Sequence, residues 1–142
     1  MEKRKLFLSV CFLLIIKIIC YAQIISTHLL VNTTWQHEKN NKVTRYLDFT
    51  KDSIIVSYNY YNETIIYSKP YYLSNNKDEP FNMEKVGTST SGKYLFLWNL
   101  TMKEKEYCEI TTLTEDSLVL FFEAKPHYIG AADVYRTFKR VR

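Results

Sequence analysis

Side chains suited to metal binding or nucleophilic catalysis are few in this chain of 142 residues. His28, His37 and His127 are its only histidines, and none has metal-ligand spacing from another histidine, a cysteine or paired carboxylates. Cys108 alternates with Ile110 in an apolar stretch, where a cysteine is usually a small buried apolar residue. No histidine or aspartate is placed by sequence to activate it. We therefore predict no metal site, no cofactor and no catalytic residue.

Acidic residues and glycines do not add a catalytic pattern. Glu104, Glu106 and Glu109 are close enough to suggest paired carboxylates, but alternating charges on a solvated strand are the simpler interpretation. The chain has only 3 glycines, and they do not form a phosphate-binding loop. The sequence therefore favours a non-enzymatic protein, with an enzyme kept as the third hypothesis.

Aromatic side chains are the remaining candidates for a functional role, and the chain has 12 Tyr, 8 Phe and 2 Trp. Most must fill or cover a sheet, and some are suited to lining a ligand cavity, where tyrosine hydroxyls add polar contacts to an apolar wall. Strand alternation predicts that Val56, Tyr58, Leu73, Ile110, Leu120 and Phe122 face the interior. For the stretch around residue 96, alternation leaves either Tyr94, Phe96 and Trp98 or Leu95 and Leu97 inside, and Phe96 joins the candidate set.

The elements that would position these residues are strands. Short stretches rich in Ile, Val, Tyr, Phe and Thr alternate with clusters of Asn, Asp, Lys and Ser, which is typical of strands and turns. The predicted strands are Thr34 to Glu38, Lys42 to Phe49, Ile54 to Tyr60, Thr64 to Ser74, Lys93 to Asn99, Glu104 to Leu113, Ser117 to Glu123 and Asp133 to Val141. Pro70 lacks a ladder donor, so we expect an edge or a bend there.

Tight turns at Thr50 to Ser53 and Thr114 to Asp116 connect successive strands without helical crossovers. Such hairpins favour an all-β, up-and-down antiparallel sheet, and eight strands can close into a barrel that holds one small ligand. A sandwich is the structural alternative. The long segment Asn75 to Thr90 is predicted to be a loop, in which Phe81, Met83 and Val86 form a short strand or a lid.

The N-terminus has the pattern of a signal peptide. A basic start precedes the apolar run Leu6 to Ile16, and small residues at Cys20 and Ala22 favour cleavage before Gln23. We expect residues 1–22 to form a helical signal peptide and residues 23–142 a single exported domain, periplasmic, in the outer envelope or secreted. There are two alternatives: a retained membrane anchor over Leu6 to Ile25, and lipidation at Cys20. The anchor would be the only expected membrane contact.

Removing residues 1–22 changes the composition of the domain. Basic residues fall from 19 to 15 and acidic residues from 15 to 14, which leaves a net charge of +1 instead of +4. A nucleic-acid-binding domain would keep a clustered basic surface, so we expect no nucleic acid partner. Cys108 stays as the single cysteine of the domain, which excludes an internal disulfide.

Several segments resemble bacterial lipocalin-like domains of the Bacteroidetes type. Thr33-Thr34-Trp35 is similar to the Gly-x-Trp motif that begins a lipocalin, with Thr33 in the glycine position. The hairpin around Tyr46 to Ile54, the segment Glu109 to Leu120 and the pair Tyr135-Arg136 are also similar. The resemblance implies a lipocalin or calycin-like barrel in which Trp35 packs under a C-terminal arginine, Arg136 or Arg140, at the closed end.

The resemblance further implies that the barrel binds or carries a small hydrophobic molecule outside the cytoplasm. Fold analogy alone does not establish that function. The alternative is an envelope or secreted protein-interaction module with a filled core. That alternative predicts an exposed aromatic patch, for which the Asn75 to Thr90 loop is the candidate.

Overall fold

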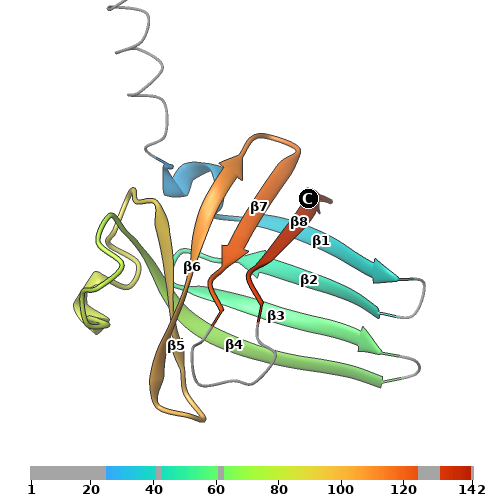
Figure 1. Cartoon of the computed structure of the whole chain (residues 1–142), viewed down its shortest axis with the longest axis horizontal. Helices are drawn as coiled ribbons and strands as arrows, with labels where there is room; N and C mark the ends of the chain where they lie inside the picture. The colour runs from blue at the N-terminus through green and yellow to red at the C-terminus, as the bar shows by residue number, and fades with distance from the viewer. Residues whose placement is uncertain (1–24, 41–42, 61–62, 125–131, 142) are drawn as a thin grey trace, which may run out of the picture.

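The computed structural model describes residues 25–40, 43–60, 63–124 and 132–141, and its strands form a closed antiparallel barrel (Figure 1). The strands are β1 (Thr33–Asn40), β2 (Val43–Phe49), β3 (Ser53–Tyr60), β4 (Glu63–Ser74), β5 (Tyr94–Asn99), β6 (Glu104–Leu113), β7 (Ser117–Phe122) and β8 (Val134–Arg140). Each strand pairs with the next, and β8 pairs with β1. The predicted eight-stranded up-and-down barrel is confirmed, and the sandwich is excluded.

The predicted signal peptide, with its cleavage site and the alternative anchor and lipidation site, lies outside the described residues. None of the helices in the described part of the chain has the length and apolar character needed to cross a membrane.

One end of the barrel is closed by the segment that precedes β1. This segment contains the short 3₁₀ helix η1 (Thr27–Leu29) and inserts Leu30, which is completely buried in the core. Trp35 is also completely buried, and its Nε1 donates a hydrogen bond to Thr33 Oγ1 at 2.6 Å. The hydroxyl of Thr33 in turn donates to the Leu30 carbonyl. The closed end is therefore filled by apolar side chains whose few polar atoms have partners.

Two turns of the same design lie at this closed end. Thr50 Oγ1 accepts a hydrogen bond from the backbone N–H of Ser53 at 3.0 Å, and Thr114 Oγ1 accepts one from Ser117 N–H at 3.0 Å. The threonine hydroxyl thus replaces a ladder partner at each reversal of the chain. Both predicted hairpins, β2–β3 and β6–β7, are confirmed.

Gly92 is required by the close approach of the segment before β5 to the end of β4. A Cβ at this position would lie 2.5 Å from the backbone nitrogen of Ser74, which no side-chain adjustment can relieve. The N–H of Gly92 donates to the Ile25 carbonyl at 3.0 Å. The glycine therefore joins the segment before β1 to β4 and helps to seal the closed end.

At the opposite end the barrel opens along a seam between β4 and β5. β4 pairs with β3 from Glu63 to Pro70, whereas its register with β5 covers only the four pairs from Tyr71↔Leu97 to Ser74↔Tyr94. β5 and β6 then diverge from the first half of β4 (Figure 1). Pro70 lies where β4 changes partners, and this position agrees with the predicted edge or bend.

The loop between β4 and β5 covers the outer face of the barrel rather than its mouth. Its 3₁₀ helix η2 (Met83–Lys85) follows Phe81, whose ring lies 5.1 Å from that of Tyr72 and 5.3 Å from that of Trp98. Lys105 Nζ fastens the loop by donating to the carbonyls of Lys77 at 2.9 Å and Glu79 at 2.7 Å. A short helix therefore replaces the predicted strand or lid, and the loop's only aromatic side chain packs against the barrel.

Candidate functional site

The interior of the barrel contains a cavity of about 280 Å³ above the packed closed end. Its walls, partly apolar and partly polar, come from inward-facing residues of every strand from β2 to β8. The lining residues are Arg45, Leu47, Ile54, Val56, Tyr58, Tyr67, Lys69, Leu95, Leu97, Glu106, Cys108, Leu120, Phe122, Arg136 and Phe138. The volume is close to the lower limit for small-molecule sites, about 300 Å³.

Four of the predicted interior residues line this cavity. They are Val56, Tyr58, Leu120 and Phe122. Leu73 and Ile110 also face inward, but they belong to the buried core rather than to the cavity wall. Alternation thus predicted the correct face for all six.

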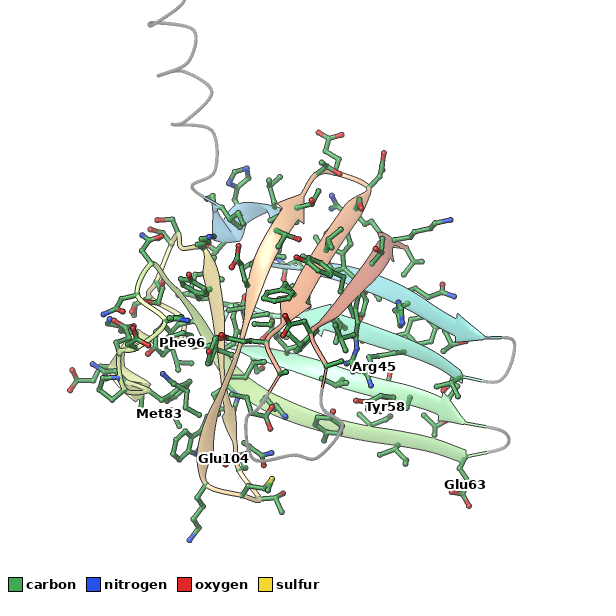
Figure 2. The ribbon with its side chains drawn as sticks, viewed as in Figure 1. Arg45, Tyr58, Glu63, Met83, Phe96 and Glu104 are labelled. Atoms are coloured by element: carbon green, nitrogen blue, oxygen red, sulfur yellow. The ribbon has the colours of Figure 1, made fainter. Side chains whose placement is uncertain are left out.

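The prediction that Phe96 faces the interior is wrong. Leu95 and Leu97 line the cavity instead, and Phe96 packs on the outer face, with its ring centroid 5.3 Å from that of Tyr72. In Figure 2 Phe96 lies on the side of Met83, well away from Arg45 and Tyr58. The residue is nevertheless completely buried, because Lys105 covers its ring at 4.6 Å.

Of the two arginines predicted to pack against Trp35, only Arg140 has the required position. Arg140 lies directly opposite Trp35 in the β1–β8 register, and its Nη1 donates to the Glu115 carbonyl at 3.4 Å. Arg136 lies four residues earlier on β8 and lines the cavity, with its guanidinium carbon 4.7 Å from the centroid of the Phe122 ring. Arg136 is therefore a cavity residue, and a cation–π contact between Arg140 and Trp35 stays a prediction.

A layer of four charged side chains lies in the cavity, one from each even-numbered strand. These are Arg45 on β2, Lys69 on β4, Glu106 on β6 and Arg136 on β8. Each precedes by two positions a core residue of its own strand: Leu47, Tyr71, Cys108 and Phe138, respectively. Because even-numbered strands of this barrel run in the same direction, equal offsets put the four charges at the same depth.

Sequence reasoning missed this layer because it placed Glu106 on a solvated strand and Arg136 at the closed end, and assigned no role to the other two residues. The interpretation of Glu106 as part of a solvated strand is wrong, since it forms an ion pair with Lys69 and accepts a hydrogen bond from Asn99 Nδ2 at 2.7 Å. Glu109 does face outward and pairs with Lys93 at 2.9 Å. The sequence did contain a signal: Glu106 has the same strand alternation as Cys108 and Ile110, which face inward.

Two tyrosines complete the polar part of the cavity. The hydroxyls of Tyr58 and Tyr67 lie 2.9 Å apart, and their rings stack with centroids 5.9 Å apart. Burial, followed by the hydrogen bond with Tyr58, raises the pKa of Tyr67, so the Tyr67 phenol is protonated at neutral pH. The two hydroxyls add donors and acceptors beside the charged layer.

Arg45 lies over the Tyr58 ring, with its guanidinium carbon 4.2 Å from the ring centroid. Burial lowers the pKa of Arg45, and the nearby charge of Arg136 lowers it further, although it stays protonated. Arg45 and Arg136 also line a neighbouring hollow with His37, Val134 and Tyr135. Both guanidiniums therefore form part of the wall between the cavity and this hollow.

Cys108 lies at the inner boundary of the cavity. Its side chain is 1% exposed, and burial raises the pKa of its thiol to about 12. A protonated, buried thiol is a poor nucleophile. No group of three His, Cys, Asp or Glu side chains within the described residues is arranged to hold a metal ion.

Comparison of the chain with known protein families, curated proteins and solved structures finds no significant match. The class of the protein is therefore defined by its fold, a closed eight-stranded antiparallel barrel with a partly polar interior cavity. The lipocalin resemblance stays a proposal based on sequence segments such as that around Trp35.

Proposed function

We propose that this chain is an exported, non-enzymatic, lipocalin-like protein that binds or carries a small hydrophobic molecule in its barrel. The cavity of about 280 Å³ supports the proposal, because a barrel that served only as a scaffold would gain stability by filling it. Ligand sites combine apolar walls with convergent polar groups, and this cavity places the apolar side chains of Val56 and Leu120 in the same wall as Tyr58.

A neutral apolar dye tests the binding activity without involving charge. We expect phenylnaphthylamine to bind with a blue-shifted, enhanced emission, and the variant L120W, whose indole would occupy the cavity, to lose this signal. Ile66, which is 66% exposed, provides the matched control I66W. Equal dye binding by L120W and the unmodified protein would locate the dye outside the barrel and contradict the proposal.

Export is tested by N-terminal sequencing of the protein purified from the cells that produce it. We expect the mature chain to begin at Gln23, because Ala22 and Cys20 suit the peptidase. Recovery of the chain with Met1 retained and associated with membranes would support the alternative anchor.

A protein-interaction module is the second candidate. The surface that supports it is a set of exposed apolar residues at the open end, not the Asn75 to Thr90 loop that the sequence predicted. Ile65, Ile66, Leu100 and Met102 are each more than half exposed at the β3–β4 and β5–β6 turns. The Asn75 to Thr90 loop lacks an exposed aromatic patch because Phe81 packs on the barrel. Loss of partner capture by I66S/M102S, with dye binding intact, would support this second function.

A further inference from the structure

The charged layer inside the cavity is only half neutralised. Lys69 and Glu106 form an ion pair with each other. The guanidiniums of Arg45 and Arg136 rest instead on the aromatic rings of Tyr58 and Phe122. No carboxylate among the described residues forms an ion pair with either arginine.

Two partly buried like charges without a counterion are unfavourable in a protein interior. Burial removes water from the guanidiniums, and their mutual repulsion adds to this penalty. Cation–π contacts compensate only in part, because an aromatic ring carries no net charge. The described residues that line the cavity thus carry an excess of two positive charges.

An anion positioned between the guanidiniums would remove this imbalance. A guanidinium presents a planar fork of N–H donors that matches the two oxygens of a carboxylate. One hydroxyl of the Tyr58–Tyr67 pair donates to the other, so the second keeps its hydrogen for a further acceptor. The site therefore offers both cationic and neutral donors.

We propose that the ligand is a medium-chain amphiphile whose carboxylate lies between Arg45 and Arg136 and whose hydrocarbon tail enters the apolar part of the cavity. The inference rests on the proposed function and specifies its ligand class. The tail would pack against Leu47, Val56 and Leu95. A cavity of about 280 Å³ favours a short, flexible alkyl chain over a large rigid molecule.

Calorimetric titration of the full chain with decanoate, decanol and decylamine tests the head group at constant tail length. We expect decanoate to bind about tenfold or more tightly than decanol, the increment typical of charge-assisted hydrogen bonds, and decylamine to bind most weakly. Rising salt concentration should weaken decanoate binding and leave decanol binding unchanged, because only the carboxylate interacts with the excess charge.

The double variant R45M/R136M should bind decanoate and decanol equally, because methionine keeps apolar bulk without charge. The single variants R45M and R136M should each lose part of the preference, and they keep the test valid where the double variant does not fold. Lys139, an exposed cation on β8 whose side chain alternates with those of Arg136 and Phe138, provides the charge-matched control K139M.

The outcomes separate this inference from the proposed function. Equal affinity for decanoate and decanol, or an unchanged preference in R45M/R136M, would overturn the carboxylate inference and leave a binding protein for neutral apolar molecules. Failure to bind decanoate while phenylnaphthylamine still binds would also overturn it. Failure of all four compounds would contradict the proposed function itself.

Discussion

The two ends of the barrel interior are built from the same eight strands, yet their contents differ in kind. At the closed end Leu30 and Trp35 are completely buried, and the buried hydroxyl of Thr33 has hydrogen-bond partners. At the open end Arg45 and Arg136 enclose a cavity without a carboxylate of their own among the described residues. One end is arranged for stability and the other is arranged at some expense of stability, which is typical of a functional site.

The largest difference is expected for matched truncations of phenylalanine. Phe49 is 2% exposed at the closed end and meets Tyr71 edge to face at 5.5 Å, so F49A should lower the free energy of unfolding by about 3–5 kcal/mol. Phe122 is only partly buried and already adjoins the cavity, so F122A should lower it by about 1–2 kcal/mol. Urea unfolding monitored by circular dichroism measures both values. Equal losses would mean that the two ends are packed alike.

Replacing a leucine by the larger tryptophan tests the same difference between the two ends, with both positions on one strand. Leu118 and Leu120 both face inward from β7, but only Leu120 lines the cavity. L118W should destabilise the protein by about 1–3 kcal/mol, because it forces extra volume into a packed core. L120W should be tolerated because its indole enters the existing space. Urea unfolding measures the free energy of unfolding of both variants. A destabilisation by L120W as large as that by L118W would show that no usable cavity exists.

The difference between the ends also explains how far the sequence could predict the molecule. The strands were predictable because turns such as Thr50 to Ser53 are explicit and because β3 alternates regularly between apolar and polar side chains. The correct face of β5 was not predictable. Phe96 is buried on the outer face, under Lys105, as deeply as Leu95 is buried inside, so alternation carries no signal there.

The cavity was harder to predict than the barrel. Its shape depends on where the β4–β5 ladder ends at Tyr71 and on which side chains fill the closed end, and both result from tertiary packing. Its charges were visible in the sequence, but only Arg136 was predicted to lie inside the barrel, at the closed end, and Glu106 was predicted to face solvent. Four charged residues that each stand two positions before an apolar, inward-facing residue on alternate strands are a pattern that a sequence can reveal once the barrel register is known.

Cys108 lies at the boundary between the two ends, so its titration reports whether water reaches the cavity floor. The folded protein retains the thiol proton up to about pH 12, whereas an unfolded chain releases it near its ordinary value of about 8.5. Above that pH the unfolded state binds fewer protons, so the stabilising contribution is lost as the pH rises. We expect the stability difference between the protein and C108A to shrink by up to about 2 kcal/mol between pH 8 and pH 10.

Urea unfolding of the protein and of C108A across this range measures the change, and subtraction of the two curves removes the contribution of the other titrating groups. A difference that does not vary with pH would indicate that the thiol ionises equally in both states. The cavity floor would then be accessible to water, and the contrast between a packed end and an open end would begin one layer deeper than Cys108.

The smallest expected effect on stability concerns the arginines themselves. R45M and R136M remove a partly buried charge that lacks a carboxylate partner among the described residues, so each should leave the free energy of unfolding unchanged or raise it by up to about 1 kcal/mol. Urea unfolding without added ligand measures the change, with K139M as the control for a surface cation. A loss of several kcal/mol would assign the guanidiniums a structural role through their aromatic contacts with Tyr58 and Phe122. Unchanged or increased stability is the result expected of residues that serve a ligand rather than the fold.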